Sequence, residues 1–467
     1  MARIVIMGGG PAGYEAALVA AQHGAEVTVV EDEGAGGACV LYDCVPSKTF
    51  TASAGVRVSL QRASDLGIRA VPDRIGADVP VVHGRVKGLA LAQSADVRTR
   101  LQREGVRLLA GTARLADEAP GLASHRVDVA AHDGTAETLD ADVVLVATGA
   151  RPRILPDAVP DGERILTWRQ VYDLAELPRE LVVVGSGVTG AEFVSAYAEL
   201  GVAVTLVSSR DRVLPGEDAD ATAVLEDAFA ERGATVVKHA RALKVERTSD
   251  GVLVHLDDGR TASGSHALMT VGSVPNTTDL GLDTAGLATG ARGHLEVDRV
   301  SRTAAPGIYA AGDCTGLLPL ASVAAMQGRI AMWHALGEGV APIKLKTVAA
   351  AVFTHPEIAT VGISQQAIDD GEVAARTIML PLATNPRSKM QGLRRGFVKL
   401  FCRQATGVVI GGVVVAPVAS ELILPIALAV SNNLTVDDLA QTFSVYPSLS
   451  GSMTEACRQL MRHDDLD

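Results

Sequence analysis

Short apolar runs that lead into glycine-rich turns recur along most of the chain, and they predict buried strands. Such runs occur at Ile4 to Met7, Val143 to Val146, Leu181 to Val184 and Ile308 to Ala311. Residues 51–105 instead alternate apolar and charged positions with helical period, which predicts scaffold helices. Strand and helix patterns in this order favour an α/β fold.

The pattern changes from about Lys344. Longer alternating β segments occupy 347–353, 396–402 and 408–415, and they predict an antiparallel sheet in a separate domain. Helices near Glu421 and Leu439 are expected to cover one face of this sheet and to pair with another subunit.

One pattern occurs twice. Residues 3–31 read as strand, glycine turn, helix and strand, and residues 181–208 repeat that order. The spacing also repeats, because Glu31 lies 23 residues after Gly8 and Ser208 lies 23 residues after Gly185. The chain is therefore predicted to contain two dinucleotide sites.

The first turn is a G-x-G-x-x-G, where the backbone can approach a pyrophosphate at the N-terminus of the next helix. Glu31 closes the second strand, and a carboxylate there can hydrogen-bond a ribose hydroxyl. Small residues after a later strand permit close approach to the same cofactor. The residues expected at this first site are Gly8, Gly10, Pro11, Ala12, Gly13, Glu31, Ala147, Thr148 and Gly149.

The second turn repeats the glycines but not the acid. Ser208 and Ser209 replace the carboxylate and Arg210 and Arg212 follow, so nothing repels a 2′-phosphate and two cations can hold it. This favours NADPH over NADH; the alternative is that both arginines are solvated surface charge. The residues expected at this second site are Gly185, Gly187, Val188, Thr189, Gly190, Ser208, Ser209, Arg210 and Gly272.

A later strand, Ile308 to Ala311, leads to Gly312 and Asp313 at its C-terminal edge. A carboxylate at that place can accept hydrogen bonds from a sugar-alcohol chain. The helix expected from Leu320 and Ala321 has N-terminal amides that are suited to face an isoalloxazine ring.

The segment Gly36 to Lys48 contains Cys39 and Cys44, five positions apart in a chain with 5 cysteines. Two thiols this close, with glycine before them and a lysine after, favour a redox pair, and a helix is expected to begin near Cys39 and carry Cys44 one and a half turns on. The alternative is two unrelated buried cysteines that behave as small hydrophobes.

Composition excludes several classes. With 467 residues, 48% hydrophobic content and a net charge of −12 without a basic tract, a disordered chain and a nucleic-acid partner are not expected. Residues 2–7 are too short for a signal peptide, so we expect a cytoplasmic protein. The apolar stretch 407–430 contains Pro417 and Pro425, which predicts a buried strand, turn and helix rather than a membrane span.

The other histidine and cysteine residues predict no metal site. Cys314, Cys402 and Cys457 have no metal-ligand spacing, and His355 in F-T-H-P-E is interpreted as structural. An odd number of cysteines also argues against a disulfide framework.

Two nucleotide folds, a C-x4-C between them and a terminal sheet domain together resemble the flavoprotein disulfide reductases, the family of dihydrolipoamide dehydrogenase and glutathione reductase. The resemblance covers essentially the whole chain. The resemblance implies a homodimer with FAD at the first turn and a nicotinamide nucleotide at the second. It implies an FAD domain at 1–150 and 273–343, an NAD(P) domain at 151–272 and an α+β dimerisation domain at 344–467. It also implies FAD contacts from Gly37, Lys48, Thr112 and Asp313, and a Glu192 that pairs with Lys48 beside the flavin.

In the cycle that the resemblance implies, hydride passes from nicotinamide to flavin, flavin reduces a disulfide, and a thiol reduces the substrate. Cys44 would face the flavin and Cys39 would meet an outside disulfide. Dihydrolipoamide dehydrogenases, however, end in H-P-T-x-S-E, whose histidine is the acid and base for thiol exchange. Here Tyr446 replaces that histidine and Gly451 the glutamate, and a tyrosine with a pKa of about 10 is a poor base.

The Y-P-S-L-S-G ending resembles lipoamide-dehydrogenase-like NAD(P)H:quinone reductases, whereas residues 208–212 and 320–329 resemble soluble transhydrogenases. We therefore predict an FAD-dependent NAD(P)H:quinone reductase with the candidate catalytic residues Cys39, Cys44, Lys48 and Glu192. The alternatives are a disulfide reductase that uses Cys39 and Cys44, a transhydrogenase-like enzyme, and a binding protein without turnover.

Overall fold

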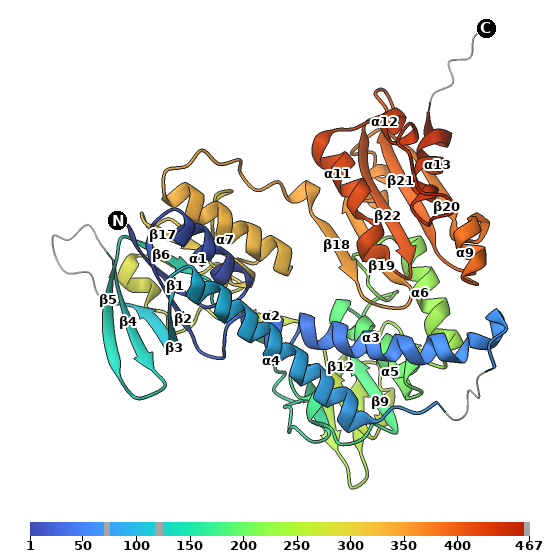
Figure 1. Cartoon of the computed structure of the whole chain (residues 1–467). Coiled ribbons are helices and arrows are strands. Elements are labelled where there is room, and N and C mark those ends of the chain that lie inside the picture. The colour runs from blue at the N-terminus through green and yellow to red at the C-terminus, as the bar shows by residue number, and fades with distance from the viewer. Residues whose placement is uncertain (70–74, 117–124, 462–467) are drawn as a thin grey trace. The chain divides into compact units, whose positions relative to one another are not determined.

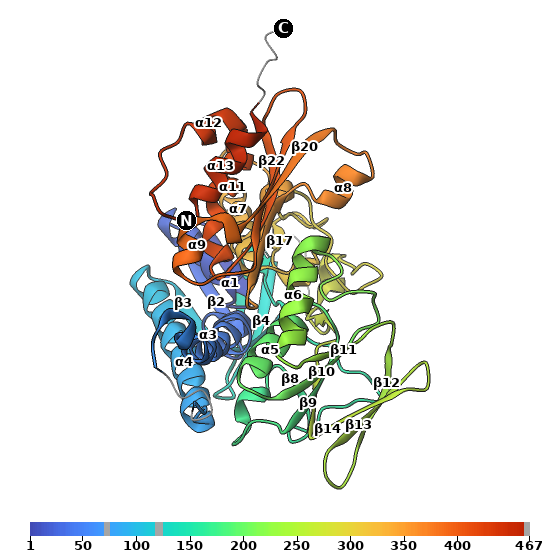
Figure 2. The ribbon, with the colours of Figure 1, turned by 90° about the vertical axis from the view of Figure 1, so that its right-hand side faces the viewer.

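The structure, a computed structural model, describes residues 1–69, 75–116 and 125–461. The chain forms two compact units, whose elements are drawn in Figures 1 and 2. Unit 1 consists of Met1–Thr49, His83–Arg153 and Gly272–Ile343, and unit 2 of Phe50–Val82, Ile154–Val271 and Lys344–Asp467. The division into three domains at 1–150 with 273–343, 151–272 and 344–467 stays a prediction.

Unit 1 is built on a seven-stranded sheet with the order β17-β6-β1-β2-β3-β4-β5. Its strands are β1 (Arg3–Met7), β2 (Glu26–Glu31), β3 (Arg107–Leu115), β4 (His125–Ala131), β5 (Ala136–Ala141), β6 (Val143–Val146) and β17 (Ile308–Ala310). The pairs from β17 to β3 are parallel, and β3, β4 and β5 form an antiparallel meander. A short antiparallel pair is formed by β7 (Ala150–Pro152), which follows β6 in the chain, and β16 (Ser273–Pro275).

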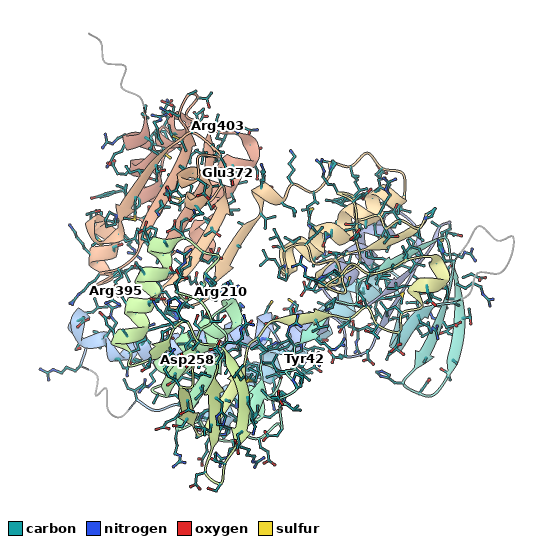
Figure 3. All side chains as sticks on the ribbon, turned by 180° about the vertical axis from the view of Figure 1, so that it is seen from behind. Tyr42, Arg210, Asp258, Glu372, Arg395 and Arg403 are labelled. Atoms are coloured by element: carbon teal, nitrogen blue, oxygen red, sulfur yellow. The ribbon has the colours of Figure 1, made fainter. Side chains whose placement is uncertain are left out.

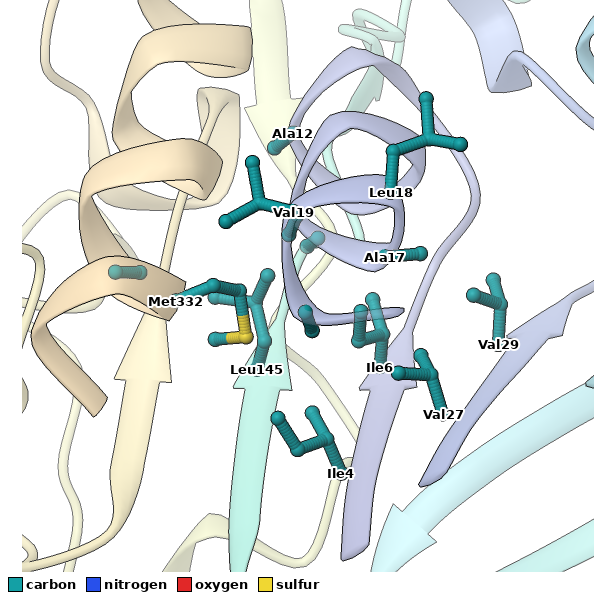
Figure 4. Close-up of a cluster of buried hydrophobic side chains, with 14 of the residues drawn as sticks. Ile4, Ile6, Ala12, Ala17, Leu18, Val19, Val27, Val29, Leu145 and Met332 are labelled. Atoms are coloured by element: carbon teal, nitrogen blue, oxygen red, sulfur yellow. The ribbon is translucent and has the colours of Figure 1, made fainter. Parts of the chain in front are cut away.

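Helices α1 (Pro11–Gln22) and α7 (Ala321–Ala335) pack closely in unit 1 because small residues lie between them. An added Cβ at Gly328 would come 2.1 Å from the carbonyl oxygen of Ala12. Figure 4 shows Met332 of α7 and Leu145 of β6 in the same buried cluster as α1. The first turn of α1 is therefore packed directly against α7.

The N-terminal half of unit 2 contains a five-stranded sheet with the order β11-β10-β9-β15-β8, parallel throughout. Its strands are β8 (Ile165–Thr167), β9 (Glu180–Val184), β10 (Ala203–Val207), β11 (Thr235–Val237) and β15 (His266–Met269). The antiparallel strands β12 (Ala242–Arg247), β13 (Val252–Leu256) and β14 (Thr261–Gly264) form a separate small sheet. Helices α5 (Val188–Glu199) and α6 (Ala219–Glu231) belong to this half.

The C-terminal part of unit 2 is an antiparallel sheet with the order β18-β19-β22-β21-β20. Its strands are β18 (Ala349–Val352), β19 (Glu357–Gly362), β20 (Ala375–Pro381), β21 (Phe397–Arg403) and β22 (Val409–Ala416). Its helices are α8 (Gln365–Asp369), α9 (Pro386–Met390), α10 (Ala419–Leu422), α11 (Leu424–Asn432), α12 (Val436–Ala440) and α13 (Gly451–Leu460). The predicted antiparallel sheet is confirmed, and β19 and β20 were missed.

The apolar stretch 407–430 forms β22, α10 and most of α11, as predicted. Among the described residues, no helix combines the length and apolar character that crossing a membrane requires. After α12, the side chains of Phe443, Val445 and Tyr446 are 104%, 77% and 82% exposed. An apolar surface of this kind is typical of an interaction site.

Candidate active site

The first glycine turn joins β1 to α1 in a form that only glycine permits at Gly8. Its φ is 109°, and an added Cβ would come 2.4 Å from the carbonyl oxygen of Ala147. The amide of Gly8 donates to the carbonyl of Val30 at 2.8 Å. The turn is therefore held between the ends of β6 and β2. Thr148 and Gly149 follow Ala147 directly in the chain.

The space in front of this turn fits a pyrophosphate. An added Cβ at Gly10 would meet no atom within 4 Å, so the backbone faces open room. Gly10 caps α1 without a side-chain hydrogen bond, and the first turn of α1, which includes Pro11, Ala12 and Gly13, carries no acidic residue. The free amides of such a helix start attract an anion.

Glu31 ends β2 beside the turn. Its carboxylate accepts hydrogen bonds from the amides of Gly9 and Glu33, the latter at 2.9 Å. Burial raises the pKa of the Glu31 carboxyl, while hydrogen bonds from the backbone amides of Glu33, Gly9 and Gly34 oppose that shift. On the neighbouring strand, Ala110 pairs with Glu31, and Thr112 lies two residues beyond it.

Asp313 follows β17 at the same edge of the sheet. Gly312 adopts a φ of 82° and its amide donates to the Gln327 side chain at 2.9 Å, which ties the turn to α7. Burial raises the pKa of the Asp313 carboxyl, and the nearby His294 lowers it. Leu320 and Ala321 begin α7, whose N-cap also lacks a side-chain hydrogen bond.

The two thiols lie on different helices, so the single helix predicted from Cys39 to Cys44 is wrong. Cys39 lies within α2 (Gly37–Leu41), and Cys44 begins α3 (Cys44–Gln61). Tyr42 leaves the helical conformation with a φ of −133°, and the amide of Asp43 bonds back to the Ala38 carbonyl. A new helix then starts, because the amide of Ser47 donates to the Asp43 carbonyl at 2.8 Å.

The thiols nevertheless interact. Cys44 donates a hydrogen bond to Cys39, which lowers the pKa of Cys39 against the opposing effects of burial and of Asp43, and Lys48 lowers it further. The same bond and burial raise the pKa of Cys44. Both are free thiols, so the predicted closeness of the pair is confirmed and its redox role stays a prediction.

Gly36 and Gly37, the two glycines that precede the thiols in the chain, contact the first glycine turn. The amide of Gly36 donates to the Gly9 carbonyl at 2.9 Å, and an added Cβ at Gly37 would come 2.9 Å from the Cα of Gly10. The thiol segment therefore lies directly against the first glycine turn.

The second turn, in unit 2, has the same construction. Gly185 has a φ of 113°, an added Cβ would come 2.4 Å from the Thr270 carbonyl oxygen, and its amide donates to the Val207 carbonyl at 3.0 Å. At Gly187 an added Cβ would meet no atom within 4 Å, and α5 begins with Val188, Thr189 and Gly190 without a side-chain cap. Gly272 follows three residues after the end of β15.

Ser208, Ser209, Arg210 and Arg212, four of the five polar residues that directly follow β10, differ in the hydrogen bonds they already make. The buried Ser208 hydroxyl lies 2.7 Å from that of Ser186 and accepts from the Arg210 amide at 3.1 Å. Ser209 and Arg210 are exposed. Arg210 is labelled in Figure 3. The Arg212 guanidinium instead donates to the Pro215 carbonyl at 3.1 Å. Sequence reasoning treated both arginines alike, and the structure distinguishes them.

Glu192 is 3% exposed on α5, and its carboxylate accepts a hydrogen bond from the Phe353 amide at 3.0 Å. It belongs to unit 2 and Lys48 to unit 1, so their predicted pairing stays a prediction. Sequence reasoning missed Ser195 and Glu199 on the same helix. Their spacing of three and seven residues from Glu192 was the available signal.

No group of three or more histidine, cysteine or acidic side chains that could hold a metal ion occurs within residues 1–69, 75–116 and 125–461. His355 lies beside Glu199, with its Nδ1 3.1 Å from the Glu199 Oε1.

Comparison with known proteins places these features in context. Residues 2–328 match the family described as pyridine nucleotide-disulphide oxidoreductase, and residues 348–457 match the dimerisation domain of the same family. An NAD(P)H dehydrogenase (quinone) of Mycobacterium tuberculosis H37Rv is 67% identical over 100% of this chain and 95% of its own length. A dihydrolipoyl dehydrogenase of Chlorobaculum tepidum is 33% identical over 97% of this chain and 96% of its own length.

Solved structures show the same fold. The crystal structure of LpdA from M. tuberculosis matches with a TM-score of 0.95 at 66% identity, covering 99% of this chain and 100% of that one. The flavoprotein disulfide reductase RclA from Escherichia coli matches with a TM-score of 0.86 at 23% identity, over 99% of this chain and 100% of its own. The likeness to RclA concerns the fold alone.

Proposed function

The chain belongs to the pyridine nucleotide-disulphide oxidoreductase family, and from that premise we propose that it is an FAD-dependent NAD(P)H:quinone oxidoreductase. The observation that carries the proposal is the 67% identity to the M. tuberculosis NAD(P)H dehydrogenase (quinone) over the whole chain, against 33% to a dihydrolipoyl dehydrogenase. Tyr446 and Gly451 support it, because thiol exchange lacks the imidazole and carboxylate that move its proton.

The first turn is the proposed FAD site. The open room at Gly10 and the uncapped start of α1 suit the pyrophosphate, while Glu31 and Asp313 offer carboxylates to the ribose and to the ribityl chain. FAD held by these residues would supply two-electron chemistry, in which a hydride from NAD(P)H and one proton from solvent are matched by the two electrons and two protons that convert a quinone to its quinol.

The second turn is the proposed nicotinamide nucleotide site, with NADPH preferred over NADH. Ser208 carries no charge to repel a 2′-phosphate, and Ser209 and Arg210 are exposed beside it. Arg210 is the cation that we assign to the phosphate, since Arg212 is bonded to the loop at Pro215. Glu192 and Lys48 are assigned to orient the nicotinamide and the flavin.

We propose that the protein acts as a homodimer in the cytoplasm. The match to the dimerisation domain over residues 348–457 and the exposed Phe443, Val445 and Tyr446 support the dimer, since a second copy would bury them. All five cysteines are free thiols, which suits a reducing compartment.

A disulfide reductase is the second candidate. Its support is the hydrogen bond from Cys44 that lowers the pKa of Cys39, because the thiolate is the nucleophile in disulfide exchange. In that mechanism, electrons would pass through Cys39 and Cys44 to an outside disulfide.

Steady-state rates with menadione, dihydrolipoamide and oxidised glutathione test the two candidates. We expect NADPH-dependent menadione reduction at least about 100-fold faster than turnover of either thiol substrate, and Cys39→Ala and Cys44→Ala variants within about 2-fold of the wild type on menadione. Cys457→Ala, in the core of the C-terminal sheet, is the matched control. Rapid dihydrolipoamide oxidation, or loss of menadione turnover in both thiol variants, would overturn direct transfer from the flavin.

A further inference from the structure

One face of α5 is tied to the chain segment that precedes β19. Glu192, Ser195 and Glu199 lie three and seven residues apart on this helix, so they share a face, and none is more than 3% exposed. The Phe353 amide donates to Glu192 at 3.0 Å, and the His355 amide donates to the Ser195 hydroxyl at 3.0 Å. All five residues belong to unit 2.

The lowest member of this row, Glu199, is a fully buried carboxylate with three partners on one oxygen. The Ser195 hydroxyl donates to its Oε1 at 2.9 Å, the His355 Nδ1 lies at 3.1 Å, and Arg232 at 3.4 Å. A buried charge is tolerated only where such partners compensate it. The Ser195 hydroxyl therefore links two hydrogen bonds, because it donates to Glu199 and accepts from the His355 amide.

His355 is fixed from two further sides. Arg232, which follows α6, donates to the His355 carbonyl at 2.6 Å. Gly55 of α3 leaves room for the imidazole, since an added Cβ there would come 2.9 Å from the ring. The residue between the two bonded amides, Thr354, is fully buried and bonded to the Pro356 carbonyl at 2.7 Å. Each of the three residues of the segment 353–355 is therefore held by at least one hydrogen bond.

We propose that Glu199 is a positioning residue for Glu192: through Ser195 and His355 it holds the Phe353 amide where that amide orients the Glu192 carboxylate for hydride delivery. This inference rests on the proposed role of Glu192 at the nicotinamide. Glu192 lies four residues after the start of α5, one turn beyond the second glycine turn, so its orientation bears on how the nicotinamide lies.

Glu199→Gln tests the proposal, because it keeps an oxygen for Ser195 and removes the negative charge that lies next to Arg232 and the His355 imidazole. We expect NADPH-driven flavin reduction, followed anaerobically by stopped flow, to slow about 10-fold, while menadione-driven reoxidation of prereduced protein stays within about 2-fold. In the cofactor-free protein, hydrogen exchange at the Phe353 and His355 amides should become faster. Glu176→Gln, an exposed change in the same unit, should alter none of these readouts.

A double-mutant cycle separates positioning from a general loss of packing. If Glu199 acts through Glu192, then Glu199→Gln in a Glu192→Gln background should slow flavin reduction by no more than about 2-fold further. Additive losses, an unchanged reduction rate in Glu199→Gln, or unchanged amide exchange would each overturn the proposal.

Ser195→Ala is the second variant, with Ser249→Ala as its exposed control, and it keeps the test decisive if Glu199→Gln does not fold. The same three outcomes overturn the proposal there. Flavin reduction by NADPH needs no quinone. A wild-type protein that is reduced by NADPH but does not reduce menadione would therefore contradict the proposed function and leave this inference standing.

Discussion

The two glycine turns have nearly the same backbone and different chemistry around it. Each first glycine has a φ near 110° and leaves 2.4 Å between an added Cβ and a carbonyl oxygen. At the ribose end, Glu31 bonds to the amides of Gly9 and Glu33, whereas Ser208 bonds to the Ser186 hydroxyl and the Arg210 amide. In both units, the residue that follows or ends the second strand bonds to the second residue of the glycine turn and to the amide two residues further on. This residue is a glutamate in unit 1 and an uncharged serine in unit 2.

A loop also packs on each turn. The two loops make a similar backbone hydrogen bond to the turn but contain different functional residues. Gly36 donates its amide to the Gly9 carbonyl at 2.9 Å, and Leu214 donates its amide to the Ser186 carbonyl at 2.8 Å. The first loop leads to Cys39 and the second follows Arg210 and Arg212. The two turns thus share one backbone frame and differ at the end of the second strand and in the loop after it, where we expect nucleotide specificity to be set.

Alanine at the first glycine of each turn should have the largest effect. Gly8→Ala should weaken FAD binding by more than about 100-fold, because the Cβ clashes with Ala147 and the positive φ disfavours alanine. Gly185→Ala should retain flavin and slow its reduction by NADPH about 100-fold. Flavin-to-protein absorbance ratios and anaerobic bleaching measure both.

Gly84→Ala on α4 (Val79–Arg103) is the control, since an added Cβ there meets no atom within 4 Å. It should leave both readouts unchanged while stabilising the helix by about 0.5–1 kcal/mol. Loss of flavin from Gly185→Ala would show that the two turns do not serve separate nucleotides.

Placing the residue pair of the first turn, Gly9 and Glu31, at the equivalent positions of the second turn should shift the nucleotide preference from NADPH towards NADH. Ser186→Gly combined with Ser208→Glu copies Gly9 and Glu31, and we expect the NADPH to NADH ratio of kcat/KM to fall about 10- to 100-fold, because a carboxylate repels the 2′-phosphate and accepts the ribose hydroxyl. An unchanged ratio would refute the idea that this strand end sets preference.

The two arginines of the second loop should contribute unequally. Arg210→Ala should reduce kcat/KM for NADPH about 10-fold with little effect on NADH, because it removes a charge-assisted bond to the phosphate. Arg212→Ala should change it by no more than about 2-fold, since that guanidinium is bonded to the Pro215 carbonyl. Equal effects would contradict this assignment.

The loop over the first turn should show thiolate reactivity. Since the Cys44 hydrogen bond lowers the pKa of Cys39, iodoacetamide should alkylate Cys39 at pH 7 about 3- to 10-fold faster in the wild type than in Cys44→Ala. Mass spectrometry across pH measures this, and the profile of Cys44→Ala should move to higher pH. Coincident profiles would mean that the hydrogen bond has no such effect.

The smallest effect is expected from Asp313→Asn in cofactor-free protein. Burial raises the pKa of the Asp313 carboxyl, so the folded state holds its proton to higher pH than the unfolded state. Stability therefore falls as pH rises from the unfolded pKa of about 4 through the folded pKa, and this penalty is complete well above it. Asp313→Asn should raise the Tm at pH 7, show no gain near pH 3, and weaken FAD binding.

The repeated units could be predicted from the sequence because their signals are local. Glycines that need a positive φ and short apolar strands lie within 31 residues in the first unit, and β1, β6 and β9 occur where expected. Two strands that were not predicted have weak patterns: β5 reads A-E-T-L-D-A with alternately exposed positions, and β20 is nowhere fully buried.

Other features depend on contacts that no local pattern reveals. The break between the thiol helices follows from the backbone at Tyr42, and the different roles of Arg210 and Arg212 follow from a bond to Pro215. The row on α5 joins Ser195 to His355, 160 residues apart, so helical spacing alone could not identify its partner.

The contact between Gly328 and Ala12 has a consequence for how this fold can evolve. Because an added Cβ at Gly328 would meet the Ala12 backbone, no larger residue fits at this position without moving α1 away from α7. We therefore expect changes of specificity at the first glycine turn to arise at the end of β2, near Glu31, rather than at the contact between α1 and α7.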